Sequence, residues 1–325
     1  MLYIVPVNNC RNLIVKVFVI GYRERGESIV VLFLEGNNVL YSIVIDSYKT
    51  KEGESYTSKI LEKYNVEHIN ILCWTHPDID HSVGIDELFE KYCDEGSSVF
   101  VPVYMNGMDT DPIDYNKGDI ETINKLFTIN DRAHKCIKPV SANMGGKSHM
   151  TEIVFSDELH EIKTKIEVYA PHSDCLIEKI RKKTKIKKNV FSIFLMLQVG
   201  PYIFDFSGDV ENMAITNMND VPFNNPLFLK IPHHSSKTSD KLLGRLTNSS
   251  QSMSCTTTYY SQGLPQVDVL NEYHKRYAHL HSTGLSKEDK YSYGVLEYVF
   301  DLFGARNVHI KRHGNACKIS NDLTS

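Results

Sequence analysis

The chain has 325 residues, and its composition of 42% hydrophobic and 23% charged residues predicts a packed core and excludes global disorder. Its length suits one large α/β domain or two small ones. The formal net charge of −4 gives no overall attraction to nucleic acid, so a nucleic-acid ligand would need a local basic patch.

The cysteines and the apolar runs indicate a soluble, cytoplasmic protein. The seven cysteines include no C-x-x-C pair, which is typical of reduced thiols and argues against a cysteine-held zinc ion. The N-terminus lacks a basic start and a small-residue cleavage site, so we expect no signal peptide. The longest apolar runs, such as Ile29–Leu34, are far shorter than the roughly 18 residues that span a bilayer, so no membrane contact is expected.

The first part of the chain alternates strand and helix patterns. Runs rich in Val, Ile and Phe predict strands at Leu13–Ile20, Ile29–Leu34 and Leu40–Ile45, separated by glycine-containing turns. A short helix is expected over Ser58–Tyr64, and a second type of strand, buried and apolar, over Ile69–Trp74.

The middle of the chain is less regular. A helix is expected at Gly84–Tyr92 and a strand at Ser98–Tyr104. Residues 105–150 are polar and show no clear period, so we interpret them as an insertion that contains a helix near Ile120–Leu126.

The last part of the chain returns to a strand and helix rhythm. The expected elements are strands at Ile166–Tyr169, Phe191–Val199, Tyr202–Phe206 and Phe228–Ile231, a helix at Val267–Tyr277, and a hairpin of Gly294–Phe300 with Val308–Arg312. No linker or repeat divides the chain. The pattern therefore predicts one domain over residues 1–325, an α/β sandwich of two mixed β-sheets covered by helices.

The strongest chemical pattern is His76-x-Asp78-x-Asp80-His81, which follows a buried strand and precedes a helix. Alternate residues of an extended segment point the same way, so His76, Asp78 and Asp80 can face one side. His81 joins them where the helix begins. Imidazole nitrogens and carboxylate oxygens suit Zn²⁺, Mn²⁺ or Fe. The alternative is a charged turn in which Asp80 caps the helix.

Three further strand ends supply His or Asp side chains. Asp209 follows a glycine, the pair His233-His234 follows another strand, and His172 follows a proline. We expect one histidine of the pair to bind metal and the other to support it or to contact substrate. Each segment alone also suits an ordinary turn or a surface site. Their shared position at strand ends favours one joint metal site.

In order and spacing, these segments resemble the metallo-β-lactamase-fold hydrolases, and more narrowly the soluble domain of the competence DNA-uptake protein ComEC. The motif T-H-x-D-x-D-H is similar to the family's metal motif, with Asp78 in place of the second histidine, as is common in that branch. The similarity covers about residues 13–284 and includes V-I-D at 44–46, N-V-F-S at 189–192, F-S-G-D at 206–209 and L-K-I-P-H-H-S-S-K-T-S at 229–239. The chain departs from the family where Arg25-Gly26-Glu27 replaces Gln-Gly-Asp and Ser235 replaces a glycine.

The resemblance implies a metallo-β-lactamase αββα sandwich and two divalent metal ions, Zn or Mn, with Asp209 between them. The other implied ligands are His and Asp residues divided between the two ions: His76, Asp78 and His172 for the first, and Asp80, His81 and one of His233 and His234 for the second. Asp46 is better suited to orient a ligand than to bind metal.

Two segments are candidates for holding a phosphate-bearing substrate. Ser236 and Lys237 lie in a Ser/Thr/Lys loop that can hold phosphate through hydroxyls, backbone N–H groups and one cation. The alternative is helix capping by Ser236 or Ser239, with a solvated lysine. The basic run Lys179–Lys188 could form the local patch that DNA requires, or it could be a solvated exposed segment.

The leading hypothesis is a metal-dependent phosphodiesterase, a nuclease acting on DNA, with catalytic roles for Asp80, Asp46, Lys237 and Ser236. The first alternative is hydrolysis of a small phosphoester, a cyclic nucleotide or an acyl substrate. The second is a metal-containing regulatory component of a multi-protein system, for example in defence. Protein partners and a homo-oligomer stay open.

Overall fold

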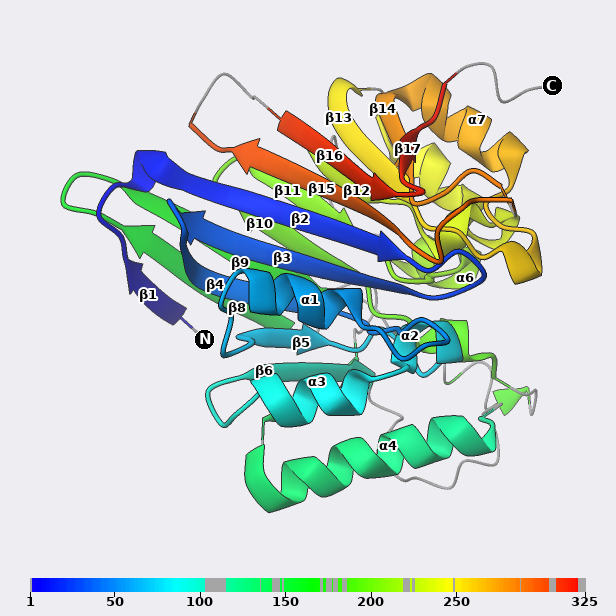
Figure 1. Ribbon diagram of the computed structural model, residues 1–325, viewed down its shortest axis with the longest axis horizontal. Helices are drawn as coiled ribbons and strands as arrows, with labels where there is room; N and C mark the ends of the chain where they lie inside the picture. The colour runs from blue at the N-terminus through cyan, green and yellow to red at the C-terminus, as the bar shows by residue number, and fades with distance from the viewer. Residues whose placement is uncertain are drawn as a thin grey trace.

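A computed structural model of the chain contains two stacked β-sheets with helices on their outer faces (Figure 1). The residues that it describes are 2–102, 115–134, 136–141, 147, 149–169, 172–173, 177, 181–182, 186–218, 223, 226–247, 249–286, 288–303 and 308–320. In this part of the chain, no helix combines the length and apolar character that crossing a membrane requires.

The first sheet has eight strands. In spatial order they are β16 (Val308–Gly314), β15 (Gly294–Asp301), β2 (Leu13–Gly21), β3 (Glu27–Glu35), β4 (Asn38–Ile45), β5 (Ile71–Cys73), β6 (Ser98–Pro102) and β7 (Ile137–Val140). Pairing is antiparallel from β16 to β4 and parallel from β4 to β7, so the sheet is mixed.

The second sheet has nine strands. Their order is β1 (Leu2–Pro6), β8 (His149–Ser156), β9 (Glu161–Val168), β10 (Leu195–Val199), β11 (Tyr202–Phe206), β12 (Phe228–Lys230), β13 (Ser249–Thr256), β14 (Tyr277–Ser282) and β17 (Cys317–Lys318). Strands β8 to β11 are antiparallel, whereas β11, β12, β13 and β14 run parallel to one another.

The apolar pattern of β3 explains the layering. Val31 and Phe33 pack into the layer between the two sheets, where Phe33 stacks on Phe155 of β8. Val30 and Leu32, which alternate with them, face the outer helices. A strand buried on both faces must be apolar throughout, which accounts for the unbroken run from Ile29 to Leu34.

Helices cover both outer faces (Figure 1). The eight-stranded sheet carries α1 (Tyr56–Lys63), α3 (Ile85–Tyr92) and α4 (Lys117–Ile129), and the short α2 (Ile79–Ser82) precedes α3. The nine-stranded sheet carries α6 (Asn212–Asn217), the 3₁₀ segment η6 (Lys237–Arg245) and α7 (Val267–Arg276). The predicted α/β class with two mixed sheets and flanking helices is therefore confirmed.

Several element boundaries differ from those that the sequence predicts. Residues 188–191 form a 3₁₀ turn, η4 (Lys188–Phe191), so the strand expected from Phe191 begins only at Leu195. The region 105–150, predicted as an insertion, contains α4, β7 and the start of β8. Of that region, residues 105–114, 135, 142–146 and 148 lie outside the described residues.

Candidate metal centre

Five strands end at the same edge of the sandwich, and the turns that follow them carry polar side chains. In the first sheet, Asp46 follows β4 and His76 comes shortly after the parallel strand β5. In the second sheet, Asp209 follows β11, His234 follows β12 and Thr257 follows β13. Because parallel strands present their carboxyl ends together, these side chains converge from distant parts of the chain.

Four buried side chains form the centre of this group. The ligand atoms of Asp80, His81, Asp209 and His234 all lie within 4.8 Å of one another. Nε2 of His234 lies 3.3 Å from Oδ2 of Asp80, and Nε2 of His81 lies 3.4 Å from Oδ2 of Asp209. These residues could hold a metal ion, since imidazole nitrogens and carboxylate oxygens suit Zn²⁺ and Mn²⁺.

His76 lies beside this cluster. Its Nε2 is 3.9 Å from Oδ2 of Asp209, and its ring centroid is 4.3 Å from that of His81. Within the described residues, Nε2 of His76, Nε2 of His81 and Oδ1 of Asp209 are buried without a hydrogen-bond partner. Burying polar atoms without partners is costly, so three such atoms at one point fit a bound cation.

Two of the imidazole rings are oriented through Asp46. Nδ1 of His81 donates to Oδ2 of Asp46 at 2.7 Å, and the hydroxyl of Thr75 donates to the same oxygen. Nδ1 of His76 therefore donates to the Thr75 hydroxyl, 3.1 Å away. Each Nδ1 hydrogen bond fixes its ring so that Nε2 is directed toward Asp209. Burial lowers the pKa of His76, whereas the carboxylates of Asp209, Asp46 and Asp80 outweigh burial and raise the pKa of His81.

His234 is oriented by a separate chain of contacts. Its Nδ1 lies 2.8 Å from Oγ1 of Thr257, and the Thr257 hydroxyl donates to Glu27. Glu27 in turn forms an ion pair with Lys230 at 2.6 Å, and both side chains are buried. The pKa of Glu27 falls below its usual value because attraction to Lys230 and His234 outweighs the cost of burial.

Glu27 and Lys230 were not among the residues that sequence reasoning assigned to the site. The sequence nevertheless contains a feature that points to each of them. Lys230 interrupts the apolar run Phe228–Ile231, and Glu27 stands where the resembled family has an aspartate. A charged residue inside a buried strand generally requires a buried partner.

The site gathers several buried carboxylates. Among the described residues, those of Glu27, Asp46, Asp80 and Asp209 are no more than 2% exposed, and they share the site with the ammonium of Lys230 and with the imidazoles of His81 and His234. Burial disfavours their ionisation, but His81 and His234 outweigh it, lowering the pKa of Asp80 to about 2 and that of Asp209 well below its usual value. Buried carboxylates at one point stabilise positive charge, which Lys230 and the imidazoles carry here and which a bound cation would also supply.

The two adjacent histidines have different surroundings. His234 is fully buried within the cluster. His233 is partly exposed, its Nε2 accepts from the Asn189 amide at 3.2 Å, and its Nδ1 donates to Thr238 at 2.8 Å. With a φ of 49° at each histidine, the left-handed backbone turns the two rings in different directions, with centroids 6.5 Å apart.

Asp78 and His172 lie outside the cluster of the described residues. Asp78 caps α2 and forms an ion pair with Lys188 at 2.8 Å, and Lys188 also contacts Asp119 at 3.0 Å. His172 is completely buried, and no metal-compatible group in the described part of the chain includes it.

The candidate phosphate-holding residues also lie apart from the cluster. The Ser236 hydroxyl accepts from the backbone N–H of Thr238 and caps η6, as the alternative interpretation of this loop expects. The Lys237 ammonium forms an ion pair with Asp268 at 2.5 Å, and both side chains are more than half exposed. Of the predicted basic run, Lys179, Lys183 and Lys185 lie outside the described residues.

Fold and site together define an α/β sandwich with a buried His/Asp group that could hold a metal ion. No protein-family model matches the chain, and no curated protein matches it. Further conclusions about this protein therefore rest on its own residues.

Proposed function

We propose that the protein is a metal-dependent hydrolase with the metallo-β-lactamase fold. The proposal is supported by two mixed sheets flanked by helices and by a buried His/Asp group at the carboxyl ends of parallel strands. The sequence motifs that resemble this family, T-H-x-D-x-D-H, F-S-G-D and L-K-I-P-H-H-S-S-K-T-S, supply the same residues.

One observation carries the metal-dependent part of the proposal. The Nε2 atoms of His76 and His81 and the Oδ1 atom of Asp209 are buried and lack hydrogen-bond partners among the described residues. The Nδ1 atoms of the two histidines are held by Thr75 and Asp46, respectively. An arrangement that fixes the far side of each ring by a hydrogen bond and directs the near side toward a buried carboxylate is typical of metal ligands.

We further propose that the site binds two divalent ions, Zn or Mn. Asp80, His81 and His234 would hold one ion, and Asp209 would lie between the two. His76 would hold the other with Asp78 and His172, and Asp78 would then have to leave its ion pair with Lys188. Divalent ions of this kind activate water near neutral pH and stabilise charge that develops on the scissile group.

The protein's own residues would orient the metal-binding histidines and contact the substrate. Asp46 and Thr75 fix the rings of His81 and His76, and Glu27 with Thr257 fixes that of His234. The partly exposed His233 lies at the rim, where a substrate would reach it. Its Nε2 is 3.9 Å from Oδ2 of Asp209, so it is suited to contact a bound substrate.

As substrate class we propose the phosphodiester of a nucleic acid, with DNA as the first candidate. The resemblance to a DNA-uptake domain favours it, and so does Arg25, an exposed cation in the turn that leads to Glu27. A small phosphoester is the competing substrate, because Lys237, expected to hold phosphate, pairs with Asp268 at the surface instead.

The test is cleavage of labelled single- and double-stranded DNA with added Mn²⁺ or Zn²⁺, alongside hydrolysis of bis(p-nitrophenyl) phosphate. The matched pair of variants is Asp209→Asn, which changes the centre, and Glu90→Asn, which changes an exposed residue of α3. We expect metal-dependent cleavage by the wild type and by Glu90→Asn only. Hydrolysis of the small ester without DNA cleavage would favour the small-phosphoester function, and no hydrolysis of either by the metal-loaded wild type would overturn the hydrolase proposal.

A further inference from the structure

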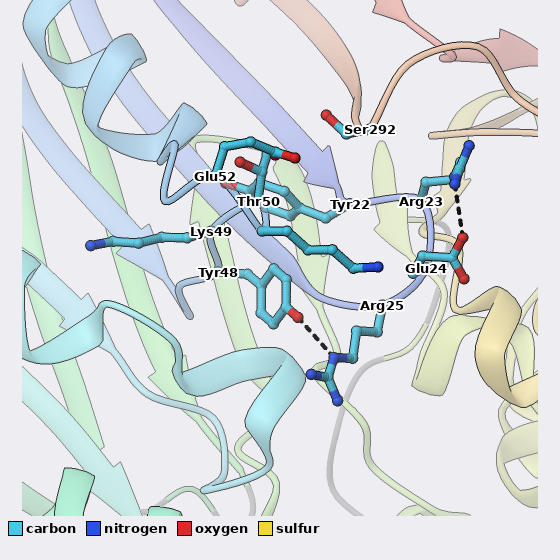
Figure 2. Close-up of a pocket in the computed structure, with 10 residues that line it drawn as sticks. Tyr22, Arg23, Glu24, Arg25, Tyr48, Lys49, Thr50, Glu52 and Ser292 are labelled. Carbon is cyan, nitrogen blue, oxygen red and sulfur yellow. Dashed lines mark hydrogen bonds and ion pairs between the residues drawn. The ribbon is translucent and has the colours of Figure 1, made fainter.

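A cavity of about 310 Å³ lies at the turn between β2 and β3 (Figure 2). It lies between the turn that joins β2 to β3, the segment that follows β4, and the residue Ser292 before β15. Its lining is rich in cations and tyrosines: Tyr22, Arg23, Glu24, Arg25, Tyr48, Lys49, Thr50, Lys51, Glu52 and Ser292.

Both walls of the cavity are continuous with residues that orient the metal ligands. One turn carries Arg25 and, two residues later, Glu27, which supports His234 through Thr257. The other segment carries Asp46, which orients His81, and two residues later Tyr48. The cavity is therefore joined by short, buried segments to both sides of the candidate centre.

These walls are held in place by close packing. The ring of Tyr48 lies against Gly26, where any side chain would collide with it, and it packs on Tyr22 with a centroid distance of 5.2 Å. The backbone N–H of Ser47 donates to the carbonyl of His81 at 3.1 Å, tying the second wall to the metal motif. The first wall is tied to the loop after β13, since Ser261 donates to the Glu24 carbonyl.

Two of the four cations that line the cavity have carboxylate partners among the described residues. Arg23 pairs with Glu24 at 3.0 Å, and Lys49 extends over Gly84 to pair with Glu87. Figure 2 shows the Lys49 ammonium directed away from Arg25.

Arg25 differs from these residues. Its side chain is exposed, its Nε donates to the Tyr48 hydroxyl at 2.8 Å, and no carboxylate of the described residues lies within ion-pair distance. The Tyr48 bond uses only Nε, which leaves the two terminal nitrogens of a fixed guanidinium for an anion.

The loop after β13 places an aromatic ring against the metal cluster. The ring of Tyr259 meets that of His234 edge to face, with centroids 5.3 Å apart. Attraction between Arg25 and both Tyr259 and Asp80 contributes to a raised pKa of Arg25, after its hydrogen bond with Tyr48. Arg25 and Tyr259 thus both lie near the cluster, Arg25 close to Asp80 and Tyr259 against His234.

We propose that Arg25 binds a phosphate of a nucleic-acid strand next to the scissile one, and that the strand continues through the cavity bounded by Tyr48 and Lys51. This inference rests on the proposed hydrolase function, since it names the polymer that the centre would cleave. A planar guanidinium matches the oxygens of a phosphate, and the exposed Lys51 beside Arg25 in the lining adds a second cation for a neighbouring phosphate.

The test compares two arginines at opposite ends of β2. Arg25→Ala removes the proposed contact, Arg25→Lys keeps the charge without the planar fork, and Arg11→Ala removes a surface arginine before the start of the strand. The probes are a fluorescein-labelled 12-nucleotide single-stranded DNA, an RNA of the same sequence, and bis(p-nitrophenyl) phosphate, a small ester without a flanking phosphate.

We expect Arg25→Ala to weaken oligonucleotide binding about tenfold and to reduce the salt dependence of binding by about one phosphate contact. Arg25→Lys should recover part of the affinity, and Arg11→Ala should bind like the wild type. Hydrolysis of the small ester, metal content and thermal unfolding should change little in all three variants. The comparison of DNA with RNA identifies which strand is preferred.

The phosphate site at Arg25 and the hydrolase activity can be tested separately. Unchanged oligonucleotide binding by a folded Arg25→Ala protein, or an equal loss in Arg11→Ala, would overturn the phosphate site even if the wild type cleaves DNA. Selective loss of binding in Arg25→Ala would support the phosphate site even if the wild type cleaves neither probe.

Discussion

Nδ1 of His81 donates a 2.7 Å hydrogen bond to Oδ2 of Asp46, and both side chains are fully buried. The bond links α2 to the turn after β4, at which Asp46 has the left-handed φ of 58°. The same carboxylate accepts from the backbone N–H and the hydroxyl of Thr75. Asp46 thus orients His81 directly and His76 through Thr75, although it is not a member of the central cluster itself.

This relationship predicts the effect of Asp46→Asn. An amide of the same size keeps part of the hydrogen bonding but lacks the charge that holds the proton on Nδ1, so metal affinity should fall about 10- to 100-fold. Competition with a chromophoric chelator would measure it. Asp86→Asn is the control, because Asp86 makes only a surface pair with Lys125. Equal affinity in both variants would show that Asp46 has no orienting role.

The histidine pair allows a second prediction. His234→Ala should abolish tight binding of one ion, because Nε2 of His234 lies in the cluster and 3.3 Å from Asp80. His233→Ala should retain its metal, because that ring is held by Asn189 and Thr238 at the rim. Metal content by mass spectrometry after dialysis measures both. The assignment is wrong if His233→Ala is the variant that loses metal.

The ion pair of Glu27 and Lys230 allows a prediction about stability. Lys230→Met leaves the Glu27 carboxylate buried without its cation, which should lower the free energy of unfolding by about 3–5 kcal/mol. Adding Glu27→Gln to this variant should recover part of that loss, since the uncompensated charge is gone. Urea denaturation of the two proteins gives the comparison. A double variant no more stable than Lys230→Met would mean that charge burial is not the cause.

Asp205 of β11 predicts a dependence of stability on pH. It is completely buried, neither oxygen has a hydrogen-bond partner among the described residues, and burial raises its pKa to about 8. In the unfolded chain the pKa would be about 3.9. Between these values the folded state holds a proton that the unfolded state has released, so this group lowers stability as pH rises from about 4 to 8.

The variant Asp205→Asn removes that titration. Its free energy of unfolding should exceed that of the wild type by a growing margin between pH 5 and pH 8, with the two proteins most similar at the acidic end. Urea unfolding at several pH values measures the margin. A constant difference across this range would show that Asp205 does not titrate as burial predicts.

Strands with a strong apolar pattern could be predicted from sequence, and strands without one could not. The apolar runs of β2, β3 and β4 matched their predicted positions within a few residues. Strand β13, with the sequence SSQSMSCT, has little apolar or β-branched content. It is a strand because β12 and β14 pair with it on either side, which local sequence does not express.

The residues of the candidate site could likewise be predicted only in part from the sequence. The sequence alone determined that His and Asp residues follow several strands, and parallel strand ends bring such residues to one edge. Only the tertiary structure decided which of them meet: His234 lies inside the cluster and His233 at its rim, Asp78 pairs with Lys188, and Lys237 pairs with Asp268. The physical reason is that spacing in the sequence fixes only position along the chain. The direction of a side chain depends on backbone dihedrals, as at the left-handed turn of His233 and His234, and on partners from distant segments, as in the Asp46–His81 hydrogen bond.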